Sequence, residues 1–206
     1  GVRLVGSEMC IRDRDIGANV GIYSCYAAKK KHCKVYAFEA SVFNLEFLTK
    51  NIYLNNLNDK IIIFSLPLTD KVKETDFNMS SIDAGSASST FGEEYKQDGT
   101  NLNKIFSYKT LGLSIDKAVE YMELQCPDYI KMDVDGIEHL ILSGGTKILS
   151  KVEEILVEVD EKFDKQFQEV KRILEMSGLK LMSKNQSRLM QKENSESKLF
   201  NQIWKR

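Results

Sequence analysis

Apolar residues along the chain fall into two patterns, short continuous runs and stripes that recur every three or four residues. The runs predict strands buried in a sheet, and the stripes predict helices that turn one face toward a core. Continuous runs occur at Val35–Phe38, Ile61–Phe64 and Ile155–Val159. Because runs and stripes alternate, we expect an α/β fold built on a doubly wound sheet.

The predicted helices lie between these runs. One begins near Val20, one follows the N-cap candidate Ser41, and a later one ends at Gly178. Two further apolar segments, Leu179–Met182 and Leu199–Trp204, are separated by a polar stretch. They predict a closing antiparallel hairpin.

Two segments depart from this order. Residues 1–14 should contain the first, central strand, but they read Ile11-Arg12-Asp13-Arg14 where apolar residues are expected. Either that strand is very short or the segment is not native, and we favour a non-native N-terminal segment followed by a single domain over residues 15–206. Residues 71–108 carry no helical stripe, and predict either a lid that closes over an acceptor or a surface hairpin.

Composition narrows the range of partners. The chain has 206 residues, 42% of them hydrophobic, which suits one globular domain. A net charge of −1 and a pI near 6.2 give no basic field for a nucleic-acid backbone or an anionic membrane. We therefore expect a small-molecule or glycan partner and no nucleic acid.

No apolar run approaches the roughly 20 residues that cross a bilayer, so we expect no membrane span. The four cysteines form no CxxC pair, and zinc-site spacings are absent. These features predict reduced thiols and a cytoplasmic location. The pattern does not indicate an oligomeric state.

The stretch DIGANVG, from Asp15 to Gly21, predicts a strand-to-helix turn that meets a ligand. Gly17 and Gly21 allow backbone torsions and close approaches that a Cβ would block. The next strand ends in Glu39, 18 residues after Gly21, near the spacing at which a doubly wound sheet places an acid against ribose hydroxyls. Asp70, after Pro67, is a weaker candidate for an adenine contact.

The dinucleotide fingerprint GxGxxG fails here, because Asn19 and Ile22 occupy two of its three glycine positions. Asp15 at the start of the turn would repel a pyrophosphate and suits an ammonium group or hydroxyls. The turn therefore favours a cationic cofactor over a dinucleotide.

A second polar cluster follows the run at Tyr129. Lys131, Asp133 and Asp135 alternate toward one side, and Gly136 leads into a helix that contains Glu138. Such a group at the carboxyl edge of the sheet lies where open α/β sheets bind ligands. The alternative is a structural ion network. His139, in the same helix, is expected to face outward.

DIGANVG followed by FEA resembles the S-adenosylmethionine site of class I methyltransferases, and IKMDVDGIE at 130–138 narrows the resemblance to the FkbM family. The similarity runs from Asp15 to the C-terminal NQIWKR. It implies a Rossmann-like class I methyltransferase fold, with a seven-stranded, mostly parallel sheet in the order 3-2-1-4-5-7-6, an antiparallel last strand and helices on both faces.

By position, the resemblance implies that S-adenosylmethionine is the cofactor. Its methionine part would be held by Asp15, Gly17, Asn19 and Gly21, and its ribose hydroxyls by Glu39. Asp133 and Glu138 would lie near the reacting methyl group. Where the family usually has Glu, this chain has the shorter Asp135.

The expected reaction is O-methylation of a hydroxyl on a sugar, a glycan or a small metabolite. Asp133 is the candidate base, and Lys131 or Glu138 would orient it or tune its pKa. A Mg²⁺ ion held by Asp133, Asp135 and Glu138 is a disfavoured alternative, so no metal site is predicted.

Two functions from other classes stay open. One is a non-catalytic nucleoside-binding domain or a truncated fragment. The other is an NAD-dependent oxidoreductase, against which the failed GxGxxG argues.

Overall fold

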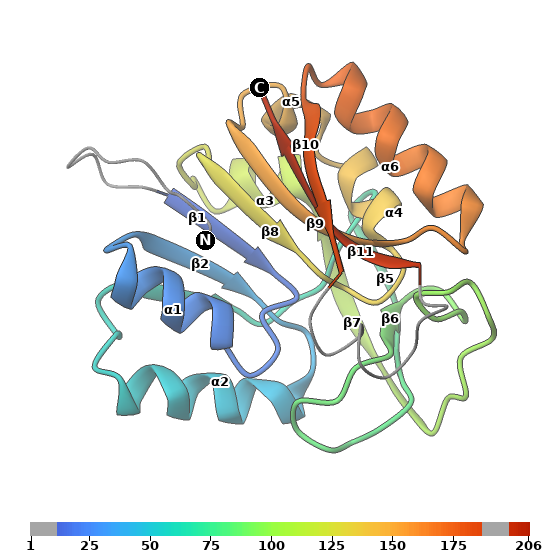
Figure 1. Ribbon diagram of the computed structural model, residues 1–206. Helices are drawn as coiled ribbons and strands as arrows, with labels where there is room; N and C mark the ends of the chain where they lie inside the picture. The colour runs from blue at the N-terminus through green and yellow to red at the C-terminus, as the bar shows by residue number, and fades with distance from the viewer. Residues whose placement is uncertain (1–11, 187–197) are drawn as a thin grey trace.

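The computed structural model describes residues 12–186 and 198–206, and its main sheet has seven strands in the order β10-β11-β9-β8-β1-β2-β3 (Figure 1). The strands are β1 (Arg12–Ile16), β2 (Lys34–Phe38), β3 (Ile61–Phe64), β8 (Tyr129–Met132), β9 (Glu154–Asp160), β10 (Lys180–Asn185) and β11 (Leu199–Lys205). The pairs from β3 to β9 are parallel, whereas β11 is antiparallel to both β9 and β10. The predicted strand order and antiparallel last strand are confirmed.

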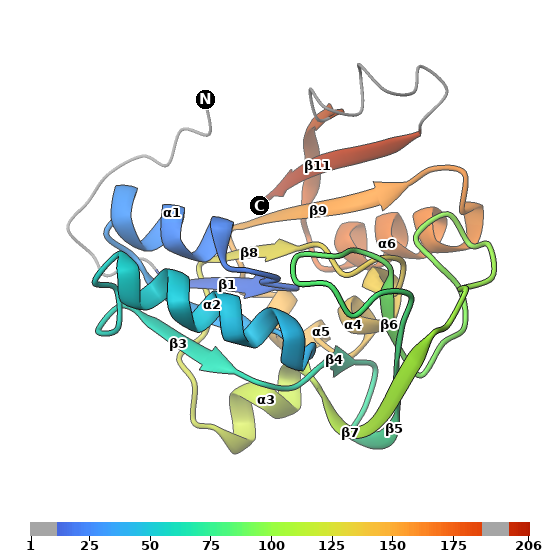
Figure 2. The same cartoon turned by 90° about the horizontal axis from the view of Figure 1, so that it is seen from below.

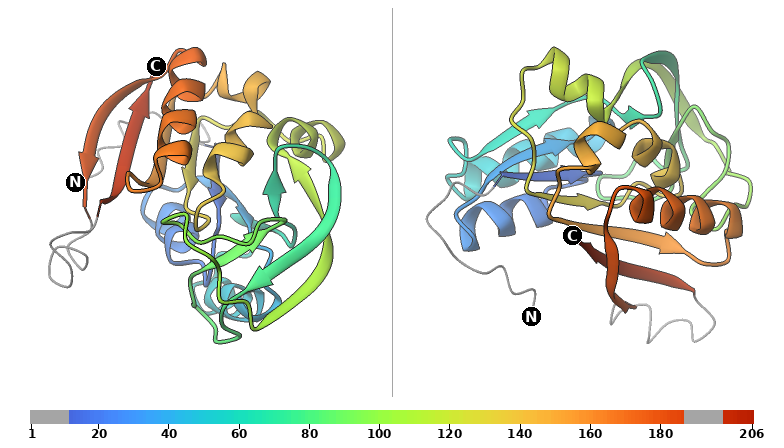
Figure 3. Two further views of the ribbon diagram at one scale, coloured as in Figure 1. Left: turned by 90° about the vertical axis from the view of Figure 1, so that its right-hand side faces the viewer. Right: turned by 90° about the horizontal axis from the view of Figure 1, so that it is seen from above.

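Helices cover both faces of this sheet (Figures 2 and 3). One face carries α1 (Ile22–Lys30) and α2 (Val42–Leu54). The other carries α3 (Ile115–Tyr121), α4 (Glu138–Ser143), α5 (Thr146–Leu149) and α6 (Asp164–Met176). Within the described residues, no helix has the length and apolar character needed to cross a bilayer.

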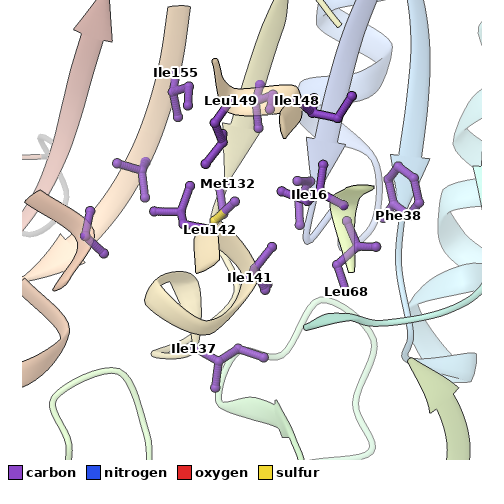
Figure 4. Close-up of a cluster of buried hydrophobic side chains, with 14 of the residues drawn as sticks. Ile16, Phe38, Leu68, Met132, Ile137, Ile141, Leu142, Ile148, Leu149 and Ile155 are labelled. Atoms are coloured by element: carbon purple, nitrogen blue, oxygen red, sulfur yellow. The ribbon is translucent and has the colours of Figure 1, made fainter. Parts of the chain in front are cut away.

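The strand β2 shows why the central strands are apolar at consecutive positions. Val35 and Ala37 pack toward α1 and α2, whereas Tyr36 and Phe38 pack toward the opposite core. Successive side chains of a strand point to opposite faces, so a strand covered twice needs apolar residues throughout. The larger core contains side chains from β1, β2, β8, β9, α4 and α5 (Figure 4).

Residues 71–108 contribute to a second, smaller sheet. Its strands are β4 (Leu68–Thr69), β5 (Lys73–Met79), β6 (Ser89–Phe91) and β7 (Phe106–Ser114), in the order β4-β7-β5-β6. The antiparallel pairing of β5 with β6 and β7 turns the segment back across the carboxyl ends of the main strands. Residues 71–108, called the insertion below, thus contain β5, β6 and the start of β7, and the loops between these strands reach the site described below.

The central strand β1 is charged, yet it is buried along most of its length. Asp13 and Arg14 are 1% and 3% exposed. The Asp13 carboxylate accepts a hydrogen bond from the Tyr23 hydroxyl at 2.9 Å, and the Arg14 guanidinium lies 4.0 Å from the centre of the Tyr36 ring. Burial raises the pKa of Asp13 to about 7, and the Tyr23 hydrogen bond opposes that rise.

Residues 12–14 thus extend β1 to five residues, so the short-strand alternative is not what the structure shows. Burying these charges costs desolvation free energy, and partners on neighbouring elements offset that cost. The sequence pattern alone does not reveal those partners. The proposed non-native origin of residues 1–14 stays a prediction, and residues 1–11 lie outside the described part.

Candidate functional site

A cavity lies at the carboxyl ends of β1, β2 and β8, bounded on its outer side by the insertion. It holds about 580 Å³ of empty space, part of which opens to solvent. Its apolar wall includes Phe38, Leu66, Phe77, Phe91, Ile137 and Ile141. Its polar residues include Asn19, Glu39, Asn44, Asp133 and Asp135. An apolar pocket with a few convergent polar groups is typical of small-molecule sites, and this position is where open α/β sheets bind ligands.

The predicted glycine turn forms the floor of the cavity. Gly17 has a φ of 77°, and a Cβ on it would lie 1.9 Å from the carbonyl oxygen of Asp133. The turns after β1 and β8 therefore pack backbone to backbone, which only glycine permits. Gly21 has a φ of 85° and begins α1, but a Cβ there would meet Leu48 of α2 at 2.4 Å. Gly21 thus serves helix packing and does not line the cavity.

Glu39 faces the cavity from the end of β2 and is 7% exposed. Its carboxylate accepts the backbone N–H groups of Asn19 and Ser41, both at 2.7 Å, and the Asn44 amide at 3.5 Å. Burial raises the pKa of Glu39, and the donated N–H groups oppose this effect. Each carboxylate oxygen has two lone pairs, so acceptor capacity is left for a ligand hydroxyl.

Asp15 and Lys131 lie behind the cavity, where they pair with one another. Asp15 is fully buried, with Ser24 Oγ donating to Oδ2 at 2.6 Å and Lys131 Nζ lying 3.2 Å from Oδ1. Lys131 also donates to the Gly17 carbonyl oxygen at 2.8 Å. Burial by itself would lower the pKa of Lys131, but Asp15 and Asp133 raise it overall. Lys131 is thus a fixed ammonium that supports the glycine turn.

Asp133 is the most accessible acid of the cluster. Its side chain is 42% exposed and lines the cavity, and its Oδ2 lies 3.7 Å from Lys131 Nζ. The backbone N–H of Asp133 donates to the Ile16 carbonyl oxygen at 3.1 Å, which fixes the turn after β8 against β1. Among the predicted catalytic residues, Asp133 is the one that borders the cavity.

Glu138 lies beneath the loop that carries Asp133. It is fully buried, and it accepts the backbone N–H groups of Val134 and Gly136 at 3.1 Å and the side-chain amide of Gln166. Burial raises the pKa of Glu138 to about 8. Glu138 therefore shapes the loop and does not line the cavity. His139 beside it is also buried, edge-on to Phe163, which corrects the expected outward orientation.

Three polar side chains tie the insertion to the cavity. Asn19 donates its amide to the Ser86 carbonyl oxygen at 3.4 Å, and Asn44 accepts the Gly85 N–H at 2.8 Å. Asp135 accepts the backbone N–H groups of Ser88 at 2.7 Å and Ser89 at 3.3 Å. Residues 85–89 thus form a strap over the cavity. Sequence reasoning missed Asn44, although its position after the Ser41 cap placed it at the same sheet edge.

Asp70 is outside the residues that line the cavity, although Leu66, Pro67 and Leu68 before it do line it. Its carboxylate pairs with Lys73 at 3.0 Å and accepts the Thr69 hydroxyl at 2.9 Å. Asp15, Gly21, Lys131 and Glu138 also lie outside the lining of the cavity. The predicted site residues that do line it are Gly17, Asn19, Glu39 and Asp133.

Among the described residues, the acids near the cavity do not form a metal-binding cluster. Across residues 12–186 and 198–206, no group of three or more histidine, cysteine or acidic side chains is arranged to hold a metal ion. In the disfavoured Mg²⁺ alternative, Asp135 and Glu138 would be ligands, but Asp135 Oδ2 and both carboxylate oxygens of Glu138 already accept backbone N–H groups.

The chain is similar to known methyltransferases over most of its length. Residues 15–185 match the family described as Methyltransferase FkbM domain. The hexuronic acid methyltransferase AglP of Haloferax volcanii is 28% identical over 145 residues, which is 70% of this chain and 54% of the relative. This chain thus spans about half the length of that curated relative.

Solved structures agree on the fold. Methyltransferase FkbM from Methylobacillus flagellatus KT aligns with a TM-score of 0.61 at 13% identity, covering 98% of this chain and 45% of that one. An rRNA methylase from Streptococcus thermophilus aligns with a TM-score of 0.55 at 11% identity, covering 95% and 86%. The shared sheet and the family match over residues 15–185 lead to one assignment: the chain belongs to the FkbM family of methyltransferases.

Proposed function

We propose that this protein transfers the methyl group of S-adenosylmethionine to a hydroxyl group of a sugar or glycan. The observation that carries the proposal is Asp133, a half-exposed carboxylate at the border of a cavity suited to a nucleoside. An alcohol must lose its proton as its oxygen attacks, and a carboxylate placed at the border of the cofactor cavity can accept it.

The residues of the cavity fit an S-adenosyl cofactor by their chemistry. Aromatic and aliphatic side chains on one wall suit a purine base, and Glu39 offers carboxylate oxygens to ribose hydroxyls. Asp133 supplies negative charge for a sulfonium. When bound, this cofactor supplies an electrophilic methyl group. The chain itself would align the acceptor, exclude water with the strap at 85–89, and take up the proton.

The acceptor class rests on charge and on one relative. AglP is named for hexuronic acid, a sugar, which supports a glycan or sugar acceptor. The border of the cavity carries Asp133 and Asp135, and the Lys131 ammonium beside Asp133 is already paired with Asp15. These acids disfavour an anionic group at the point of transfer and favour a neutral hydroxyl. A hydroxyl of a small metabolite is the second acceptor class.

The decisive experiment is calorimetric titration with S-adenosylhomocysteine and, in parallel, NAD. We expect micromolar binding of the first alone. Glu39→Gln should weaken it by about 10- to 100-fold, the effect of losing a hydrogen bond to a charged acceptor. Glu46→Gln, on the exposed surface of α2, is the matched control and should bind like the wild type.

Acceptors are then tested with ¹³C-methyl-labelled cofactor and NMR detection of the new methyl group. The panel includes a neutral glycoside, a uronic acid, a small alcohol and a ribo-oligonucleotide. Methylation of the oligonucleotide alone would overturn the acceptor assignment. Binding without any product would identify a non-catalytic domain, and binding of NAD alone would identify an oxidoreductase. A cytoplasmic location belongs to the same proposal, supported by the free thiols of Cys25, Cys33 and Cys126.

A further inference from the structure

A second carboxyl group, Glu158, lies beside Asp133 on the side away from the cavity. It belongs to β9, a strand whose neighbouring residues Val157 and Val159 are fully buried. Its oxygens accept the Gln97 amide at 2.8 Å and the Asn201 amide at 3.3 Å. Gln97 comes from the insertion and Asn201 from β11, so three segments far apart in sequence converge on this carboxyl group.

The strand register places Glu158 next to Asp133. The strands β8 and β9 lie side by side in the sheet (Figure 1). Met132 of β8 pairs with Val157 of β9, and Asp133 and Glu158 are the residues that come next on each chain segment. Residues paired in parallel strands point to the same face, so the two acids emerge on one side of the sheet. After burial, the charge of Asp133 is the largest influence on the pKa of Glu158, which it raises. Asn201, which pairs with Glu158 across the antiparallel ladder, lies on that same side.

The groups that face this pair leave it short of positive charge. From β8 and the loop after it come Lys131 and Asp135, while the insertion and β11 contribute the uncharged amides of Gln97 and Asn201. Within the described part of the chain, Glu158 has no ion pair of its own, and Lys131 lies closest to Asp15. Two adjacent carboxylates repel one another when both are ionised, so the pair binds a proton more tightly than an isolated carboxylate does.

We propose that Glu158 is the proton-sharing partner of Asp133, and that this pair, steadied by Gln97 and Asn201, receives the proton of the acceptor hydroxyl. The inference rests on the proposed methyl transfer. In that step the acceptor O–H bond breaks and its proton passes to the pair. The new O–C bond forms as the methyl C–S bond breaks, and that bond's electrons stay on sulfur.

The charges balance in this scheme. The pair accepts the proton in its fully ionised form, whose two negative charges stand opposite the positive sulfonium. It ends with one shared proton and one negative charge, while sulfur becomes a neutral thioether. An isolated aspartate has a pKa of about 3.9 and is a weak base near neutral pH, whereas a base works best when its pKa is close to the working pH. Burial, and then Asp133, raise the pKa of Glu158 to about 7, which meets that condition.

Carboxyl ¹³C NMR of the full chain tests the pair directly. The Glu158 resonance, identified by its absence in Glu158→Gln, should titrate near pH 7. Asp133→Asn should lower that midpoint by about one unit, because a neighbouring negative charge is lost. Glu154→Gln is the matched control, since Glu154 sits on the same strand and pairs with Lys205 at 2.8 Å. A Glu158 midpoint near the ordinary value, or one unchanged by Asp133→Asn, would overturn the inference.

A second measurement asks whether the pair faces the reacting sulfur. S-adenosylmethionine is cationic at sulfur and S-adenosylhomocysteine is neutral, so the ratio of their affinities reports the charge nearby. In the wild type this ratio should change by about tenfold between about pH 6 and pH 8 as the pair loses its proton. In Glu158→Gln it should stay constant over that range, because Asp133 then has no partner proton to lose.

The two proposals fail in different ways. If neither S-adenosyl ligand binds the wild type, the proposed function is wrong. If both bind and the affinity ratio of the wild type does not change with pH, or if Glu158→Gln keeps the wild-type pH dependence, the assignment of Glu158 alone is wrong.

Discussion

Replacing Lys131 by Met tests whether the ammonium is structural or catalytic. Lys131 Nζ lies 3.2 Å from the carboxylate of Asp15, which is fully buried. At an effective dielectric constant of about 20, two unit charges at that distance attract by about 5 kcal/mol, before desolvation is subtracted. Removing one member of a buried pair leaves the other uncompensated, which typically destabilises by about 3–5 kcal/mol. We expect Lys131→Met to fall in that range.

The partner variant separates the two effects. Asp15→Asn combined with Lys131→Met removes both charges and keeps the Ser24 hydroxyl beside an amide. We expect the double variant to be more stable than the sum of the single changes by about 2 kcal/mol or more. Urea unfolding followed by circular dichroism measures these free energies. Lys73→Met, which breaks a partly exposed pair with Asp70, is the control and should destabilise by less than about 1 kcal/mol.

A destabilisation by Lys131→Met below about 1 kcal/mol, or single changes that simply add in the double variant, would refute a structural ion pair. If the double variant still binds S-adenosylhomocysteine with wild-type affinity, neither charge contacts the cofactor.

Three further predictions follow from the site. Gly17→Ala should destabilise the protein by about 3 kcal/mol or more, because its Cβ would overlap the Asp133 carbonyl oxygen. Gly85→Ala is the control: a Cβ there has no neighbour nearer than 3.7 Å, so the change should cost only about 1 kcal/mol for an alanine in the left-handed region. Thermal unfolding measures both effects. Asp135→Ala should speed amide hydrogen exchange at 85–89 by about tenfold or more, since Ser88 and Ser89 lose their acceptor; unchanged exchange would mean that the strap is held elsewhere. The free energy of unfolding should fall by about 2 kcal/mol or more from pH 5.5 to pH 8.5, because burial raises the pKa of several acids in the folded state. The stabilising contribution of such an acid is complete below its unfolded pKa and is lost as pH rises through its folded pKa. A stability that stays constant over this range would refute the prediction. Those acids and their folded pKa values are Asp135 at about 6, Asp13 and Glu158 at about 7 and Glu138 at about 8.

Local pattern was sufficient for most of the main sheet. Apolar runs such as Val35–Phe38 form strands that are covered on both faces, and the closing hairpin consists of two apolar segments separated by a polar stretch. The hydrophobic pattern was therefore enough to predict these strands. The resemblance supplied the strand order. The insertion was harder, because β5 reads KETDFNM and its polar residues give no apolar run to mark a strand.

Candidate site residues divide along the same line. Glu39 and Asp133 were predictable because each follows a recognisable strand, and strand ends converge at one sheet edge. Glu158 and Asn44 escaped because their roles depend on contacts between distant segments, which spacing does not encode. The charges of β1 argued against a buried strand because their partners lie on other elements. Tyr23, Tyr36 and Lys131 supply these partners and make the burial possible.

The charged β1 also has an evolutionary consequence. A strand held by apolar burial can exchange one aliphatic residue for another independently, but Asp13 and Asp15 cannot change without their partners. We expect family members with an apolar residue at position 13 to lack the hydroxyl group at position 23, and those without an acid at 15 to lack the lysine at 131. Substitutions in β1 and in β8, the strand that leads to Asp133, would then occur together. Sequence variation at the centre of the sheet would therefore be coupled to variation beside the proposed catalytic residue.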